Sequence, residues 1–328
     1  MKTTPHDTAV TGVTESSFEG FHRIEFVAMG TRNEVIISAR SAGMAAAFRA
    51  DLLEWVDAFE KRISRFRPGS LISEINREAG GDWVAVDRDT EELFALCDWF
   101  HWKTRGIFDP TLLPLLDLWD YRRKREELPP SIEVARARAM VGWRRFERQP
   151  GRVRLPEAGM AIDLGGIGKE YAVDQAVALA KRNGIPDAMV SFGRDIRVFG
   201  HPPEGGAWRI GLESPESADN CWGGVAVGDA AVCGSGTYAR CFEMDGHRYG
   251  HIVDPRTGWP ADSGCDAAWV VAPSCTEAGI LSTAAIVLGV EEGMGLIEGA
   301  WRAAGCLWTD RGVHCSRRMH DYFIEALQ

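Results

Sequence analysis

Four segments in the second half of the chain follow one another as strands separated by turns, with no helical pattern between them. They are MVSFGRDIRVFG (189–200), WRIGLESP (208–215), GGVAVGDAAVCGSG (223–236) and RYGHIVDP (248–255). A doubly wound parallel sheet needs strict alternation of strand and helix, which these segments lack. The pattern therefore predicts an α+β fold with mixed or antiparallel sheets and flanking helices.

The first half of the chain contains a predicted hairpin and amphipathic helices. Apolar and polar residues alternate in FHRIEFVAMG and NEVIISAR (21–40), as in a half-buried hairpin. Apolar residues recur at steps of three and four over 42–66, which predicts a helix ended by Pro68 and Gly69. A second helix is predicted over 89–105, with Asp89 as its N-cap.

Three further segments complete the predicted organisation. FDPTLLPLLDLWDY (108–121) contains two prolines and little periodicity, so we expect an apolar loop, followed by a helix from about Ser131. SCTEAGILSTAAIVLGVEEGMGLIEG (274–299) predicts helices near the end of the chain. Residues 1–18 are polar and rich in Thr and Ser, and we predict a flexible tail there.

Composition limits the classes of partner. The net charge of −10 argues against a nucleic-acid-binding protein, which normally presents a broad basic field. The first residues contain no apolar run of signal-peptide length, and we find no window of about 20 apolar residues that predicts a membrane span. We therefore expect a cytoplasmic protein. The sequence does not indicate an oligomeric state.

The strongest local motif is DLGGIGKEYAVD (163–174), a glycine-rich turn that leads into a helix. Such a turn exposes backbone N–H groups and a helix N-terminus, both suited to a diphosphate. Lys169 would lie in the first helical turn, where it could neutralise phosphate charge. The spacing is neither a P-loop nor a GxGxxG fingerprint. On this motif alone, a structural turn and a ligand-binding loop are equally plausible.

Two other segments contain groups able to bind a ligand. RYGHIVDPRTGWP (248–260) brings His251, Asp254 and Arg256 into one turn, and GSGTYAR (234–240) adds Ser235 and Arg240. Asp-Pro and Thr-Gly are also ordinary turn formers, but the combination favours a binding site. In FDPTLLPLLDLW, an aromatic ring followed by an acidic acceptor suits a planar heterocycle, although a loop that fills the core has the same composition.

Seven motifs in one order resemble the FAD:protein FMN transferases, or ApbE family. They are AMGT (28–31), ISRFRPGSLISEIN (63–76), GIFDPTLLPLLDLW (106–119), DLGGIGKEYAVD (163–174), GSGTYAR (234–240), RYGHIVDPRTG (248–258) and STAAIVLG (282–289). The resemblance spans about residues 21–310. It implies an ApbE-like, T-fold-related flavin transferase fold over residues 19–328, as one composite domain of two subdomains.

The resemblance also implies a reaction and a set of site residues. The family transfers FMN from FAD, with Mg²⁺, onto a Thr or Ser hydroxyl of a target flavoprotein and releases AMP. Phosphoryl transfer of this kind needs neutralisation of the diphosphate and alignment of the incoming hydroxyl. By similarity, Met29, Phe66, Ile107, Phe108, Asp109, Asp163, Lys169, His251 and Ile252 would bind FAD; Gly166, Ser282 and Thr283 would bind the metal; and Lys169, His251 and Arg256 would be catalytic.

This chain departs from the family pattern at three positions. Relatives usually have Asp four residues before the metal-binding Thr, where this chain has Gly279, and Mg²⁺ prefers anionic oxygen ligands. Glu277 would reach the site only if the helix began differently. Most relatives have Tyr at the position of Phe66 and a second glycine at that of Arg194.

The Gly279 departure leaves alternatives to transfer. The chain could be a FAD-binding protein or a FAD pyrophosphatase with an impaired metal site. A third, non-enzymatic alternative is a scaffold that uses tryptophan-rich surfaces, although the twelve tryptophans are better explained as core and pocket residues.

Overall fold

A nine-stranded sheet forms the centre of the molecule. The computed structural model describes residues 10–123 and 125–324. The sheet has the order β1-β2-β3-β7-β8-β11-β14-β15-β16, and each neighbouring pair is antiparallel. Its strands are β1 (Thr11–Phe18), β2 (Phe21–Ala28), β3 (Thr31–Ser38), β7 (Ala188–Phe192), β8 (Asp195–Phe199), β11 (Ala230–Gly236), β14 (Cys265–Ala272), β15 (Ala304–Thr309) and β16 (Gly312–Cys315).

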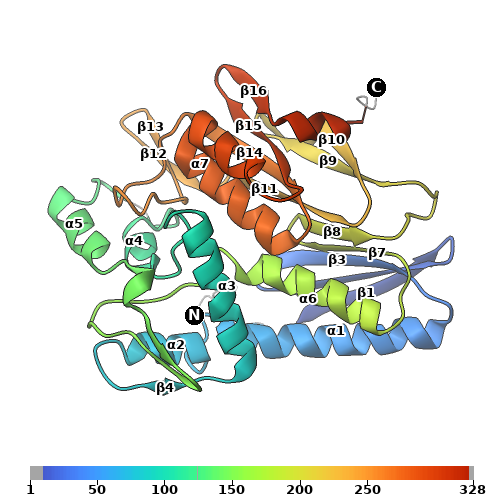
Figure 1. Ribbon diagram of the computed structural model, residues 1–328, viewed down its shortest axis with the longest axis horizontal. Coiled ribbons are helices and arrows are strands. Elements are labelled where there is room, and N and C mark those ends of the chain that lie inside the picture. Colours follow the sequence, from blue (N-terminus) through green and yellow to red (C-terminus); the bar gives the residue numbers. More distant parts are fainter. Residues whose placement is uncertain (1–9, 124, 325–328) are drawn as a thin grey trace.

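Three long helices cover one face of this sheet (Figure 1). They are α1 (Ala42–Ile63), α6 (Gly168–Arg182) and α7 (Cys275–Glu298). α7 packs on β11, β14 and β15, α6 packs on β7 and β8, and α6 also contacts both other helices. Alternate strand residues such as Phe26, Val190 and Val270 point into this layer and are almost fully buried, because side chains of a strand alternate between its two faces.

The opposite face of the sheet is covered by a long hairpin and a short helix. The hairpin consists of β9 (Trp208–Ser214) and β10 (Ser217–Val227), and the 3₁₀ helix η2 spans Arg317–Asp321. Val198, Trp269 and Cys306 of the sheet meet this layer in a second apolar cluster. The fold is thus three layers deep, which is why central strands such as β14 are apolar on both faces.

Smaller elements gather at one end of the helical layer (Figure 1). Trp119 is buried there among them, and its indole N–H donates a hydrogen bond of 2.8 Å to the carbonyl of Gly258. The elements are α2 (Leu71–Arg77), α3 (Arg88–Lys103), α4 (Leu113–Leu118), α5 (Ser131–Ala139), η1 (Trp143–Arg145), the three-stranded sheet of β4 (Val84–Ala85), β5 (Glu147–Gln149) and β6 (Arg152–Arg154), and the hairpin of β12 (Cys241–Met244) and β13 (His247–Gly250).

Most predicted elements are confirmed. The hairpin of 21–40 is β2 and β3, the glycine-rich turn leads into α6, and a helix begins at Ser131. The α+β prediction is correct, although the neighbouring strands of the large sheet are all antiparallel. α1 ends at Ile63, ahead of Pro68, because the backbone of Ser64 is already extended.

The prediction of a flexible tail over residues 1–18 is wrong for its second part. Residues 11–18 form β1, an edge strand that pairs with β2. Their side chains are exposed and polar, so composition alone resembles a tail, whereas the backbone hydrogen bonds to β2 hold the segment in the sheet. Residues 1–9 lie outside the described residues.

Three smaller expectations are also corrected. The predicted loop of 108–121 contains the short helix α4, which has Pro114 in its first turn. α7 is long and apolar enough by composition to cross a membrane, contrary to expectation, but more than half of its apolar window is buried within the fold against the sheet. The N-cap of α3 is Asp87 and not Asp89, since the carboxylate of Asp87 accepts the N–H of Thr90 at 2.9 Å.

The cap assignment predicts a difference between two neighbouring carboxylates. Asp87→Ala should lower the free energy of unfolding by about 1 kcal/mol, because it leaves an N–H group of the first turn without its acceptor. Asp89→Ala should change it by less than about 0.5 kcal/mol. Urea denaturation of both variants measures this, and equal losses would contradict the assignment.

Candidate functional site

A cavity of about 1070 Å³ opens at the edge of the helical layer, where segments far apart in the sequence meet. This volume suits a ligand of dinucleotide size, since small-molecule pockets occupy about 300–1,000 Å³. Among the residues predicted from the sequence, those that line it are Met29, Phe66, Ile107, Phe108, Asp109, Asp163, Gly166, Lys169, His251, Ile252 and Thr283. The structure therefore brings together eleven of the thirteen predicted positions.

The turn between β2 and β3 forms one wall of the cavity. Met29 and Gly30 have φ values of 52° and 69°, as expected for a two-residue type I′ hairpin turn. The N–H of Met29 donates a hydrogen bond of 2.7 Å to Oε2 of Glu60, which is buried and also pairs with Arg67 at 3.2 Å. Glu60 thus fixes the position of the Met29 side chain at the cavity.

Aromatic side chains line another part of the cavity. The guanidinium of Arg65 lies over the Phe66 ring at 4.2 Å from its centroid, and Phe66 is 41% exposed. Phe108 packs edge-on against Phe100, which orients it within the loop before α4. Exposed, oriented ring faces of this kind can stack on a planar heterocycle.

Asp109 organises the loop that contains Phe108 rather than facing a ligand with a free carboxylate. Its Oδ1 accepts the N–H of Thr111 at 2.8 Å, and its Oδ2 accepts the N–H of Trp143 at 3.0 Å. His101 lies 3.7 Å from the same carboxylate. Asp109 therefore acts as a positioning residue for the loop.

The glycine-rich turn ends at the N-terminus of α6. Its residue Ile167 provides no side-chain cap. The N–H of Gly168 donates to the carbonyl of Leu164 at 2.7 Å, so only the N–H groups of Lys169 and Glu170 in the first turn are left for another acceptor. Asp163 precedes them and accepts the N–H of Gly165 at 2.9 Å. Burial raises the pKa of the Asp163 carboxyl above its usual value, and the nearby Arg65 guanidinium partly opposes that change.

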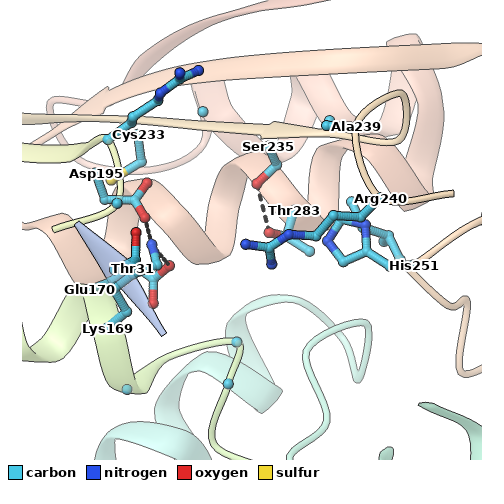
Figure 2. Close-up of a pocket in the computed structure, with 18 of the residues that line it drawn as sticks. Thr31, Lys169, Glu170, Asp195, Cys233, Ser235, Ala239, Arg240, His251 and Thr283 are labelled. Atoms are coloured by element: carbon cyan, nitrogen blue, oxygen red, sulfur yellow. Dashed lines mark hydrogen bonds and ion pairs between the residues drawn. The ribbon is translucent and has the colours of Figure 1, made fainter. Parts of the chain in front are cut away.

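A buried charged cluster follows directly on α6. The ammonium of Lys169 lies 3.1 Å from Oε1 of Glu170 and also contacts the carboxylate of Asp195 on β8 (Figure 2). Glu170 and Asp195 are 8% and 6% exposed. Sequence reasoning identified Lys169 but missed both carboxylates, although Glu170 stands beside Lys169 in the motif.

Three hydroxyl groups meet beside this cluster. Oγ of Ser235 on β11 lies 2.8 Å from Oγ of Ser282 and 2.8 Å from Oγ1 of Thr283, both on α7. Ser235 and Thr283 line the cavity, whereas Ser282 is fully buried behind them and donates to the carbonyl of Gly279 at 2.9 Å. The structure therefore places Ser282 away from the cavity and puts Ser235, which was noted only as part of a turn, into it.

His251 lies on the other side of the hydroxyl group cluster, next to Arg240 (Figure 2). Its backbone N–H donates to the carbonyl of Arg240 at 2.9 Å, while its Nδ1 is buried and has no hydrogen-bond partner in the part of the chain that the structure describes. Burial, aided by the positive charge of Arg240, lowers the pKa of the imidazole to about 4. His251 is therefore neutral near pH 7.

Arg256 does not reach the cavity, which corrects its predicted catalytic role. Its Nη2 lies 2.8 Å and its Nε 3.0 Å from the carboxylate of Asp254, and its Nη2 also donates to the carbonyl of Val287 at 3.4 Å. Asp254 is buried and accepts the backbone N–H of Arg256 as well. The pair closes the turn that follows His251, so we assign Arg256 to the structure of that turn.

Several carboxylates of the described residues line the cavity, but they are not gathered into one metal-binding group. Within the described part of the chain, no group of three or more His, Cys, Asp or Glu side chains is arranged to hold a metal. Glu277 does not compensate for Gly279, because its carboxylate pairs with Lys103 and does not line the cavity. Next to Lys169, the cavity wall contains the carboxylates of Glu170 and Asp195, and Thr283 and Gly166 add neutral oxygens.

Arg194 lies in a backbone conformation that side chains rarely adopt. Arg194 follows Gly193 in the turn between β7 and β8, and both have positive φ values, 77° and 58°. Glycine adopts such φ values without strain, whereas a residue with a side chain does so at a cost. In this chain the Arg194 guanidinium contacts Glu213, and both residues line the cavity.

Comparison with known proteins gives consistent results. The sequence profile of the ApbE family matches residues 29–307. The FAD:protein FMN transferase of Treponema pallidum is 31% identical over 294 residues, which cover 84% of this chain and 81% of that protein. A FAD:protein FMN transferase of Vibrio cholerae is 31% identical over 241 residues, 72% of each chain.

Solved structures show the same similarity. An ApbE protein from Thermotoga maritima superposes with a TM-score of 0.83 at 29% identity, covering 93% of this chain and 100% of that one. The flavinyl transferase ApbE from Pseudomonas stutzeri, in its apo form, gives a TM-score of 0.78 at 26% identity, covering 98% of this chain and 100% of that one.

The neutral state of His251 predicts a pH dependence of stability. With a pKa of about 4 in the folded protein and 6.5 when unfolded, only the unfolded chain binds this proton between those values. Stability from this group is therefore present above about pH 6.5 and is lost as the pH falls towards 4, by about 2 kcal/mol at about pH 5.

Urea denaturation at about pH 7 and pH 5 measures this effect against His251→Gln, which lacks the titrating group. The wild-type protein should lose more stability over this interval than the variant. An equal loss in both proteins would show that His251 titrates normally.

Proposed function

This chain belongs to the ApbE family, and we propose that it is a FAD:protein FMN transferase that uses Mg²⁺ to move FMN from FAD onto a Thr or Ser hydroxyl of a target flavoprotein, with release of AMP. In this step the hydroxyl oxygen forms a bond to the FMN phosphorus, and the bond from that phosphorus to the oxygen of AMP breaks. The hydroxyl proton is released, and AMP leaves with the bridging oxygen.

The observation that best supports this proposal is the division of one cavity into an aromatic and an anion-binding part. Phe66 and Phe108 provide ring faces, and the Lys169 ammonium with the first turn of α6 provides hydrogen-bond donors. FAD has the matching division, since a planar isoalloxazine and an adenine are joined by a diphosphate. The volume of about 1070 Å³ is sufficient for a ligand of this size.

The Lys169 ammonium and the backbone N–H groups of Lys169 and Glu170, in the first turn of α6, would bind the diphosphate oxygens. Phosphoryl transfer depends on charge neutralisation and alignment rather than on covalent participation of the enzyme, so one well-placed ammonium has a large effect. The buried carboxylate of Asp195 holds the Lys169 side chain at the cavity. Removal of the ammonium should therefore slow the reaction strongly.

His251 is better suited to orienting the incoming hydroxyl than to accepting the proton of that hydroxyl. An imidazole with a pKa of about 4 is neutral and can accept a hydrogen bond, but it is a weak base near pH 7. Its buried Nδ1 has no partner among the described residues, and an acceptor hydroxyl would provide one.

The residues of the cavity fit a Mg²⁺ ion. Mg²⁺ in enzymes is typically bound by one or two carboxylates together with substrate phosphate oxygens, and it stabilises charge that develops on the leaving group. Thr283, Gly166 and Glu170 line the wall beside Lys169, and Oε2 of Glu170 is buried with no partner among residues 10–123 and 125–324. A hard cation would satisfy that oxygen.

The second candidate function is FAD hydrolysis, in which water takes the place of the protein hydroxyl and free FMN and AMP form. Gly279 favours this alternative, because the usual metal-binding carboxylate is absent from α7. The two reactions share the cavity and differ only in the acceptor.

Incubation with FAD, Mg²⁺ and a flavoprotein domain that ApbE relatives modify tests the proposal. We expect a fluorescent protein band whose amount equals the AMP released, and Lys169→Ala should slow its formation about 100-fold. Lys181→Ala, at the exposed end of the same helix, should leave the rate unchanged. AMP and free FMN without a labelled band would establish hydrolysis instead.

A further inference from the structure

We propose that Glu170 supplies the metal-binding carboxylate of this chain, from α6, in the place that Gly279 leaves open on α7. The inference rests on the Mg²⁺-dependent transfer proposed above. It implies that the metal site keeps a carboxylate ligand, and that Glu170 compensates for the glycine at position 279.

The side chain of Glu170 occupies the space of a side chain at position 279. A Cβ built on Gly279 would lie 2.5 Å from Cγ, 3.2 Å from Cδ and 3.4 Å from Oε1 of Glu170. The first distance is too short for two carbon atoms that are not bonded. With Glu170 in this position, only glycine fits at 279.

Helix geometry places this carboxylate beside the predicted metal-binding hydroxyl. Gly279 and Thr283 are four residues apart on α7 and therefore lie on the same face of the helix, one turn from each other. The Glu170 side chain covers that face at Gly279, and both Glu170 and Thr283 line the cavity. An Asp at 279 would present its carboxylate over the same turn.

One oxygen of Glu170 lacks a partner. Oε1 lies 3.1 Å from the ammonium of Lys169, but Oε2 is buried and has no hydrogen-bond partner within the described residues. Leaving a buried acceptor unpaired costs about 1–3 kcal/mol, and more for a charged group. A carboxylate oxygen only accepts, so its partner is a donor or a cation.

The surrounding charges favour a cation. Glu170 and Asp195 are both buried, and the single ammonium of Lys169 contacts both of them. If both are ionised, this cluster has a net charge of −1, which would repel an incoming diphosphate. A divalent cation between Glu170 and the diphosphate would reverse that sign. The nearby hydroxyls of Ser235 and Thr283 are further oxygen donors of the kind Mg²⁺ accepts.

Binding of Mn²⁺, used as a spectroscopic probe for Mg²⁺, tests the assignment in the full-length protein loaded with FAD. Electron paramagnetic resonance measures free Mn²⁺ and therefore its Kd. Glu170→Gln keeps the size of the side chain and removes its charge, and we expect it to raise the Kd by roughly 10–100-fold. Glu277→Gln, whose parent carboxylate pairs with Lys103, is the matched control and should not change the Kd.

A second set of variants tests whether the metal-binding carboxylate can be moved from position 170 to position 279. Gly279→Asp alone should lower the thermal stability and should not tighten Mn²⁺ binding, because its side chain meets Glu170. The double variant Glu170→Gly/Gly279→Asp should bind Mn²⁺ within about threefold of the wild-type protein, whereas Glu170→Gly alone should bind it as weakly as Glu170→Gln. If Glu170→Gln does not fold, this comparison of single and double variants gives the answer.

Two results would overturn the assignment: a Glu170→Gln protein that binds Mn²⁺ as tightly as the wild type, or a Gly279→Asp protein that binds it more tightly with no loss of stability. Failure of the proposed function is a separate result. If Mn²⁺ binding depends on Glu170 but no protein is flavinylated, the metal site stands and the transferase function is excluded. If the protein is flavinylated but Mn²⁺ binding does not depend on Glu170, the transferase function stands and Glu170 is excluded as a ligand.

Discussion

The contact between α6 and α7 determines where the groups of the site lie. Both helices pack on the same face of the nine-stranded sheet and also against each other. Because Gly279 has no side chain, the Glu170 side chain packs directly against α7. Lys169 and Thr283 then lie on the same wall of the cavity. A larger residue at 279 would move either the side chain of Glu170 or the helix that contains it, and with it the N-terminus that we propose binds the diphosphate.

The charges of the cavity follow from what is buried around them. Asp163 and Glu170 are carboxylates in a wall that also contains Lys169, and the pKa of Asp163 is raised by burial. His251 is kept neutral by the same physical cause acting on a base, since removal from water disfavours the charged form of either group. The carboxylates of Glu170 and Asp195 offset the charge of Lys169, so under the proposed function a divalent cation would complete the charge for a diphosphate ligand.

Local patterns in the sequence were sufficient to predict the elements whose own residues determine them. The hairpin of β2 and β3 and the helix after the glycine-rich turn were predicted because alternation and a glycine stop are local signals. β1 was missed because backbone hydrogen bonds to β2 hold it in the sheet, whereas its own side chains show no apolar pattern. The motifs identified most segments of the cavity wall, but they did not indicate where each side chain points. Arg256 therefore turned out to bind Asp254, and Ser282 to lie behind Ser235. The relation between Glu170 and Gly279 is a contact between two helices that are distant in the sequence, so no local pattern contains it.

The most direct test of this account is a crystal structure of the protein with FAD and Mn²⁺, with the metal located by its anomalous scattering. The account predicts a metal peak between the diphosphate and Oε2 of Glu170, with a metal–oxygen distance of about 2.1 Å and the Thr283 hydroxyl also in contact. A metal bound to Thr283 and the diphosphate while Glu170 remains paired with Lys169 alone would contradict it.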